Sequence, residues 1–135
     1  MIKLKKLNAA AILICIVAAY GVFEGIWALV ATEGFIQTWA EMMGTTAKES
    51  AVLTMAVQFF GVYHLVALAS LAILAVIPLR RAERWAWITI LVLGGIGLTS
   101  GTILWAPYAP FFYVLLAMWI AALALSAKPS LQKKG

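Results

Sequence analysis

Four long apolar runs follow one another along the chain, with short polar segments between them. None of these runs shows the strict alternation of apolar and polar residues that marks a half-buried strand. In a bilayer, backbone groups must be satisfied within a helix or a closed barrel, and unbroken apolar runs favour helices. Each run supplies roughly the 20 residues that one crossing needs. The pattern predicts four transmembrane helices, at about 7–31, 48–78, 85–106 and 110–127.

The segment 32–50, between the first two runs, has a different pattern. Its polar face carries Gln37, Thr38 and Glu41, and we expect it to form a short amphipathic helix in the membrane interface, with an aromatic anchor. An ordinary polar loop is the alternative. Apolar residues recur at helical spacing on the other face, and glycines bracket the segment: Phe35, Ile36, Trp39, Met42 and Met43, between Gly34 and Gly44.

Composition places the chain in lipid. Of its 135 residues, 65% are hydrophobic and 11% are charged, and the mean hydropathy is +1.03. A soluble domain carries about 25% charged residues. We therefore expect residues 1–135 to form a single integral membrane domain, an all-α membrane-spanning four-helix bundle whose main partner is the lipid bilayer.

Lys and Arg are distributed unevenly between the polar segments. Nine of the ten lie at the N-terminus, in the 79–84 turn and in the C-terminal tail, whereas the 32–50 segment holds only Lys48. Positive segments stay on the cytoplasmic side, so both termini are predicted to be cytoplasmic. Because topology explains the net charge of +5, we expect no nucleic-acid binding. The expected location is the cytoplasmic membrane of a prokaryote, as a multi-pass protein.

The turn between the second and third runs combines arginine with tryptophan. Arg80, Arg81 and Arg84 lie close to Trp85 and Trp87, as is typical where a cytoplasmic turn meets the headgroups. The arginines are candidates for contacts with anionic headgroups, although topology alone accounts for them.

Glu24 is the only charged side chain in the first apolar run. Depth can be counted at about 1.5 Å per residue from the non-cytoplasmic end of each helix. This count places Glu24, Gln58 and Ser100 about 10, 10 and 9 Å deep. Tyr20 and Trp27 flank Glu24 at one helical turn on either side. These five residues, together with His64, are the candidates for a ligand-binding or proton-relay site.

Two hypotheses for Glu24 stay open on the sequence. In the first, Glu24, Gln58 and hydroxyls of the third helix line a pocket that opens to the non-cytoplasmic side and binds a small or amphipathic ligand or relays a proton. In the second, a protonated Glu24 is bonded to Gln58 or a hydroxyl and only holds helices together. Two pairs of small residues at similar depth would let the first and third helices approach closely: Gly21 with Gly25, and Gly97 with Gly101.

His64 is the only histidine, and the depth count places it about 10 Å from the level of Glu24. That separation argues against direct cooperation between the two. His64 stays a candidate, either as a satisfied neutral histidine or as an axial ligand to a cofactor shared with a partner chain. The chain has no Asp, which excludes a Ser-His-Asp triad, and it lacks metal-ligand spacing. We expect no catalytic residue, no metal and no cofactor of its own.

The segment LRRAERWAW (79–87), the glycine-rich third helix and the four-span plan resemble small four-helix membrane proteins, including DoxX-like proteins. The chain is also similar to small multidrug-resistance transporters, which have four helices with a Glu in the first. It differs from them in its greater length, in the 32–50 insert and in its charge bias, which disfavours antiparallel dual topology. Neither resemblance carries a site residue over to this chain.

These observations favour a non-enzymatic integral membrane protein. It would be an accessory subunit of a membrane complex or a binder of a small lipidic ligand near Glu24, with a membrane protein partner or as a homo-oligomer. The alternative is a proton-coupled small-molecule transporter in which Glu24 binds substrate and proton competitively. A third hypothesis is an enzyme acting on lipid or isoprenoid substrates, with Glu24 and His64 as acid and base.

Overall fold

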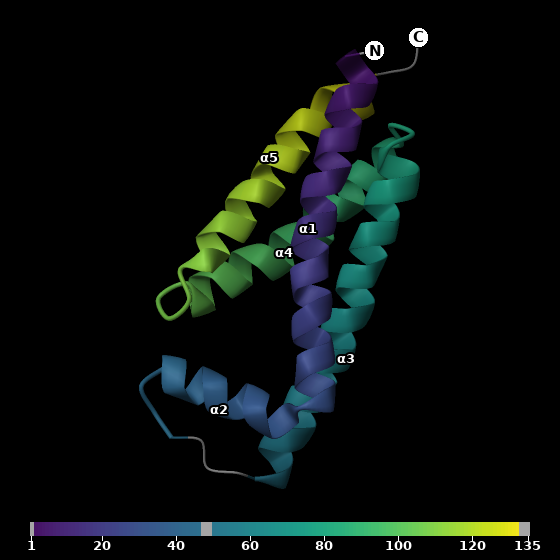
Figure 1. Cartoon of the computed structure of the whole chain (residues 1–135). Coiled ribbons are helices and arrows are strands. Elements are labelled where there is room, and N and C mark those ends of the chain that lie inside the picture. The colour runs from purple at the N-terminus through teal and green to yellow at the C-terminus, as the bar shows by residue number, and fades with distance from the viewer. Residues whose placement is uncertain (1, 47–49, 133–135) are drawn as a thin grey trace. The chain divides into compact units, whose positions relative to one another are not determined.

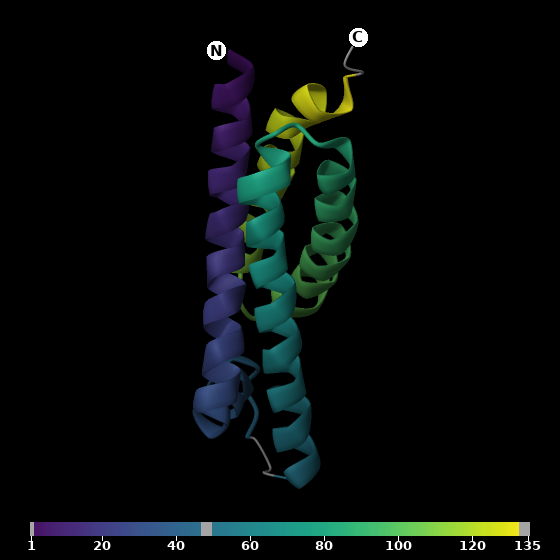
Figure 2. The ribbon, with the colours of Figure 1, turned by 90° about the vertical axis from the view of Figure 1, so that its right-hand side faces the viewer.

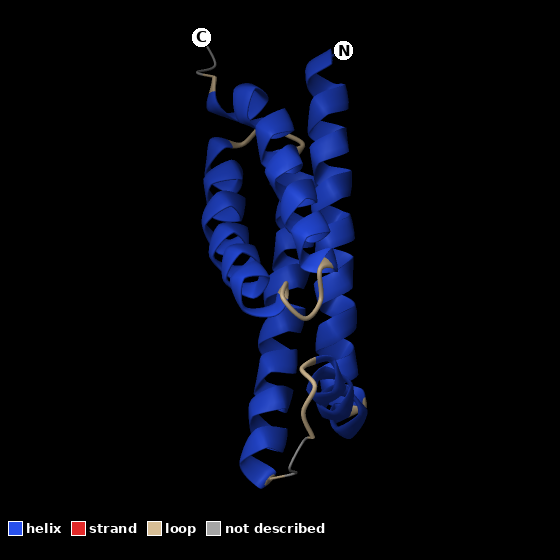
Figure 3. Ribbon diagram, turned by 90° about the vertical axis from the view of Figure 1, so that its left-hand side faces the viewer, coloured by secondary structure: helices blue, strands red, loops and turns tan. Residues whose placement is uncertain are grey.

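The computed structural model describes residues 2–46 and 50–132, which form helices joined by short turns (Figures 1 and 3). The described residues contain no strand, so the predicted all-α class is confirmed. They form five α-helices and one π-helical turn: α1 (Ile2–Val30), α2 (Thr32–Met42), α3 (Ala51–Leu74), η1 (Ala75–Leu79), α4 (Arg84–Trp105) and α5 (Phe111–Leu131).

Four helical segments of the described chain are long and apolar enough to cross a membrane. They contain 28, 29, 22 and 21 residues, and a crossing needs about 20. Helices satisfy their backbone groups internally, as the bilayer requires. These segments indicate a multi-pass membrane protein: Lys3–Val30, Ala51–Leu79, Arg84–Trp105 and Phe111–Leu131.

The helix ends differ from the predicted ones where polar or proline residues continue a helix. α1 begins at Ile2, so the basic flank before the first apolar run is helical. Pro78, expected to close the second run, lies inside η1. Proline lacks an N–H, and a π-helical turn, which changes the hydrogen-bond spacing, accommodates it. Pro129 similarly lies inside α5.

The start of α3 has a serine at its first turn. Ser50 Oγ accepts a hydrogen bond from the Leu53 N–H at 3.1 Å, which satisfies one of the free donors at a helix N-terminus. The predicted start at residue 48 lies outside the described residues.

The chain divides into two compact units. One contains residues 19–69, and the other contains residues 1–18 and 70–135. α1 contributes residues to both units. The prediction of a single integral membrane domain stays a prediction.

In the 19–69 unit, the second part of α1 and the first part of α3 run side by side in opposite directions (Figures 1 and 2). α2 follows α1 after Ala31 and leaves the axis of α1 at a sharp angle (Figure 1). Ala31 still takes part in helix-like bonding, since its N–H donates to the Trp27 carbonyl and its carbonyl accepts from the Phe35 N–H, both at 2.9 Å. The sharp angle therefore arises without a flexible linker.

α2 has one buried face, formed by Phe35, Ile36 and Ala40. It ends before Gly44, whose φ of +68° is readily adopted by glycine. The Gly44 N–H donates to the Glu41 carbonyl at 2.9 Å. A helix therefore forms in the predicted segment, although it begins two residues before Gly34. Its place in the membrane interface stays a prediction.

In the other unit, α4 and α5 follow one another as a helical hairpin (Figure 1). The indole of Trp119 on α5 packs against Gly94 and Gly95 on α4, and a Cβ at Gly95 would lie 3.2 Å from Trp119 Cη2. Trp87 Nε1 donates to the Leu123 carbonyl at 3.2 Å. Glycines on α4 thus make room for one large aromatic ring, and a second indole ties the helices together.

Candidate functional site

Glu24 lies on the part of α1 that belongs to the 19–69 unit, and only 4% of the residue is exposed. Tyr20 Oη donates a hydrogen bond to Glu24 Oε1 at 2.7 Å. Residues four apart lie on the same face of a helix, so α1 itself supplies this donor. The length is ordinary for a hydroxyl donor. One oxygen of the buried carboxyl group is therefore satisfied within its own helix.

The second carboxyl oxygen faces α3. His64 Nε2 lies 3.7 Å from Glu24 Oε2, and an approach of about 0.8 Å would bring this pair to hydrogen-bond length. Imidazole is the side chain that changes charge most readily near neutral pH. The structure thus brings a phenol, a carboxyl group and an imidazole together, and we refer to Tyr20, Glu24 and His64 as the Glu24 cluster.

Glycines allow α1 and α3 to approach closely at this cluster. A Cβ built at Gly25 would lie 2.9 Å from the Gly61 carbonyl oxygen and 2.9 Å from the Leu65 nitrogen, both backbone atoms. A Cβ at Gly21 would lie 2.6 Å from Leu68 Cγ. Small residues at a helix interface in a membrane let backbones meet in this way. The close approach brings the short side chain of Glu24 within reach of α3.

The expected separation of about 10 Å between Glu24 and His64 is wrong. The count assumed that α1 and α3 end at the same level. Because Gly25 lies against Gly61, α3 starts about 6 Å beyond the end of α1. This offset moves His64 toward the level of Glu24, and the two side chains cover the remaining distance.

The same offset removes Gln58 from the level of Glu24. Gln58 lies on α3, about 9 Å before His64 along the helix axis. The predicted pairing of Glu24 with Gln58 is therefore replaced by pairing with His64. Whether Gln58 contacts a ligand stays a prediction.

Ser100 belongs to the other unit, on α4. Its hydroxyl donates to carbonyls of its own helix, those of Ile96 at 2.6 Å and Gly97 at 3.1 Å. A Cβ added at Gly97 would meet no neighbouring group within 4 Å, so that face of α4 is open. The close contact of α1 at Gly25 is made by α3.

Trp27, a predicted flank of Glu24, belongs to a cluster of aromatic rings. Its ring centroid lies 5.3 Å from that of Phe35 on α2, with the planes at 79°. Phe35 also packs on Phe60 of α3, at 5.9 Å. Phe60 in turn lies 4.2 Å from the His64 ring. Aromatic contacts therefore connect α2 to both helices that carry the Glu24 cluster.

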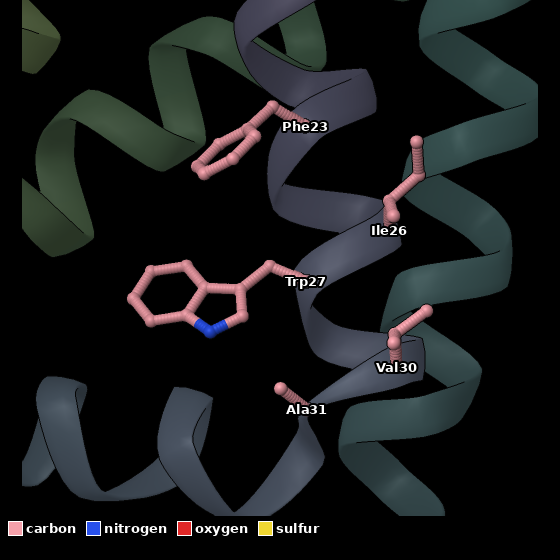
Figure 4. A pocket seen from close by; sticks show the side chains of 5 residues that line it. All are labelled: Phe23, Ile26, Trp27, Val30 and Ala31. Atoms are coloured by element: carbon pink, nitrogen blue, oxygen red, sulfur yellow. The ribbon is translucent and has the colours of Figure 1, made fainter.

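A shallow apolar hollow lies along α1 on the same unit (Figure 4). Its residues recur at helical spacing and form one stripe, and all five side chains are apolar. Glu24 is not among them. The hollow is lined by Phe23, Ile26, Trp27, Val30 and Ala31.

The three predicted headgroup residues lie near the turn between η1 and α4. Arg80 Nε donates to Asn8 Oδ1 at 2.9 Å, which ties the turn to the first part of α1. Arg81 lies in the turn itself, and Arg84 is the first residue of α4. Their contact with lipid headgroups stays a prediction.

Across residues 2–46 and 50–132, no group of three or more His, Cys, Asp or Glu side chains is placed to hold a metal ion. Comparison with protein-family models, with curated proteins and with solved structures finds no match for the chain.

The candidate site residues predicted from the sequence do not include Phe60 or Gly61. A signal for both is present, because Phe60, Gly61 and His64 fall on one face of a helix by their spacing. A glycine one turn before the only histidine marks a position where another helix can approach closely. The register between α1 and α3, however, cannot be read from this spacing.

Proposed function

We propose that this chain is a non-enzymatic multi-pass membrane protein whose Glu24 cluster takes up and releases a proton within the membrane, as in a proton-coupled small-molecule transporter. The observation that carries the proposal is a carboxyl group, 4% exposed, that faces a tyrosine hydroxyl and an imidazole. A charged group at a helix centre costs about 2.5–3.5 kcal/mol on insertion scales, and such residues commonly belong to proton relays.

The chemistry of the three side chains favours proton exchange over a purely structural bond. Tyr20 occupies Glu24 Oε1, which leaves Oε2 to share a proton with His64 Nε2. A bond that only joins helices needs one donor and one acceptor. The cluster has two groups that can each hold or release a proton, a carboxyl group and an imidazole.

The proposal includes the predicted topology and location. Both termini and the 79–84 turn lie in the cytoplasm, and α2 lies in the opposite interface of a prokaryotic cytoplasmic membrane. The Lys and Arg distribution supports this orientation. In this orientation the Glu24 cluster lies in the non-cytoplasmic half of the membrane, and Arg80, Arg81 and Arg84 are placed to contact anionic headgroups.

pH-difference infrared spectroscopy of the protein in lipid nanodiscs tests whether Glu24 exchanges a proton. We expect a carboxylic-acid band that changes with pH in the wild type and disappears in Glu24→Gln. Glu33→Gln is the matched control, because Glu33 lies on α2 outside the Glu24 cluster, and it should retain the band. A band that persists unchanged in Glu24→Gln would contradict the proposal.

Proton movement is then measured in proteoliposomes that contain an entrapped pH-sensitive dye, under a potassium diffusion potential. The wild type and Glu33→Gln should acidify the lumen faster than empty liposomes. Glu24→Gln should match empty liposomes. Equal rates for Glu33→Gln and Glu24→Gln would contradict proton movement through Glu24.

A second candidate function, binding of a small lipidic ligand, is favoured by the apolar hollow on α1 (Figure 4). Val30→Trp would fill the hollow, and Val52→Trp is a matched control because the two valines are 82% and 78% exposed. Native mass spectrometry should show a lipid adduct that is lost in Val30→Trp alone. The same spectra would reveal a membrane protein partner or a homo-oligomer, as expected for an accessory subunit.

A further inference from the structure

The imidazole of His64 is stacked on a neighbouring ring of its own helix. The ring centroids of Phe60 and His64 lie 4.2 Å apart, with the planes at 34°. The two residues are one helical turn apart, so their side chains share a face of α3. Two rings in such close contact limit each other's rotation. Phe60 therefore restricts the direction in which the imidazole nitrogens point.

Phe60 is itself held from outside α3. Phe35 of α2, which is 7% exposed, packs on Phe60 with ring centroids 5.9 Å apart. Phe35 also makes an edge contact with Trp27 of α1. α2 is thus connected by one buried ring to α1 near Glu24 and to α3 near His64.

We propose that Phe60 is a positioning residue: held by Phe35, it fixes the His64 imidazole so that Nε2 faces Glu24. The packing position of α2 then sets the distance between His64 Nε2 and Glu24 Oε2. A shift of α2 lengthens or shortens that distance. The titratable group that faces the imidazole is Glu24 of α1, and the Tyr20 hydroxyl bonds the other oxygen of the same carboxyl group. On α2, the titratable residues are Glu33 and Glu41, and neither is among its buried residues.

The effect of α2 on proton uptake rests on the proposed function, whereas the positioning of His64 does not. The two are measured separately. Because the chain has one histidine, isotope-labelled histidine gives a single set of imidazole nitrogen resonances in nanodiscs. Their chemical shifts report the surroundings of Nε2 directly, and the infrared band reports Glu24.

Phe60→Leu removes the ring and keeps an apolar side chain. We expect it to displace the Nε2 resonance in the same direction as Glu24→Gln. Phe60→Tyr keeps the ring and should restore the wild-type resonance. Phe59→Leu is the matched control, because Phe59 is the adjacent residue, is 68% exposed and packs on Tyr63 instead.

Phe35→Leu provides a second route that leaves α3 unchanged. It should displace the Nε2 resonance in the same direction as Phe60→Leu, with circular dichroism confirming that the helices persist. Wild-type resonances in Phe60→Leu and Phe35→Leu, with a displaced resonance in Glu24→Gln, would overturn the positioning role. A different outcome separates the two proposals. If the Nε2 resonance is displaced in Phe60→Leu, Phe35→Leu and Glu24→Gln, but the carboxylic-acid infrared band persists in Glu24→Gln, the proposed function is overturned and the positioning role stands.

Discussion

Glu24 is a carboxyl group inside an apolar helix, and it has the hydrogen-bond donor that such a group requires. A buried polar group is costly unless it is hydrogen-bonded, and Tyr20 on the preceding turn supplies a donor at 2.7 Å. This bond needs no other helix, so it can form as soon as α1 folds. The contact with His64, at 3.7 Å, depends on how α1 and α3 pack. The hydrogen bond to Oε1 therefore depends on α1 alone, whereas the contact of Oε2 depends on the packing of α1 against α3.

Tyr20→Phe should destabilise the protein, because it leaves Glu24 Oε1 without its hydroxyl donor. Loss of a hydrogen bond that leaves a buried acceptor unsatisfied costs about 1–3 kcal/mol. Tyr63→Phe is the control, since Tyr63 is 67% exposed, and it should stay close to the wild type. Unfolding in detergent mixtures, followed by circular dichroism, measures both variants. Equal stability of the two would show that the hydroxyl bond contributes nothing.

Gly25→Ala should weaken the contact between α1 and α3. The added Cβ would lie 2.9 Å from two backbone atoms of α3, and a backbone cannot move aside as a side chain can. Overpacking of this kind costs about 1–3 kcal/mol. Gly97→Ala is the matched control, because nothing lies within 4 Å of a Cβ there, and removing a helical glycine gains up to about 1 kcal/mol. The same unfolding measurement should give opposite signs; a neutral Gly25→Ala would contradict the close contact.

At the scale of elements, α2 is a short helix whose place depends on tertiary contacts. It has 11 residues, and isolated helices of that length are marginal in water. Its buried face consists of Phe35, Ile36 and Ala40. The aromatic contacts of Phe35 with Trp27 and Phe60 therefore decide where α2 lies.

Phe35→Ala should release α2 from α1 and α3 and leave both longer helices formed. Hydrogen–deuterium exchange of the amides of 32–42 should become faster, because their protection depends on the docked helix. Met42→Ala is the control, since Met42 lies on the same helix and is 38% exposed. The amides of α3 should exchange as in the wild type. Unchanged exchange of 32–42 in Phe35→Ala would show that other contacts hold α2.

For the whole molecule, the pattern of apolar residues was sufficient to predict four long helices, whereas for the short segment between the first two it favoured a helix and left a polar loop as the alternative. Helix formation in lipid depends on backbone satisfaction and local composition, and both can be read along the chain. The helix ends were harder to predict, because Pro78 and Pro129 continue their helices.

The candidate site was predicted in part. Glu24 and Tyr20 are one turn apart on one helix, so helical spacing was enough to place them together. His64 was placed at the wrong level because the register between α1 and α3 depends on where Gly25 meets Gly61. Registers of packed helices are tertiary properties, set by the shapes of both surfaces. Each surface can be read along the chain, but the match between two surfaces cannot.

The topology of the whole chain is predicted from its charges and its number of candidate spans. Four crossings would put both termini on the same side of the membrane, and the Lys and Arg distribution predicts that this side is the cytoplasm. Gly44 follows the end of α2 and has a φ of +68°, so an insertion after it lies outside the residues of both α2 and α3.

The test uses a reporter enzyme that is active only on the non-cytoplasmic side of the membrane. We expect it to be active when inserted after Gly44 and inactive when inserted after Ala82, between η1 and α4. Replacing Arg80, Arg81 and Arg84 together by Gln should weaken the result after Ala82, because positive charge favours the cytoplasmic side for a short turn. Arg80 also bonds Asn8, so Arg81→Gln with Arg84→Gln separates the charge effect from that bond. A cytoplasmic reporter after Gly44 in the wild type would invert the orientation and place the Glu24 cluster in the cytoplasmic half of the membrane.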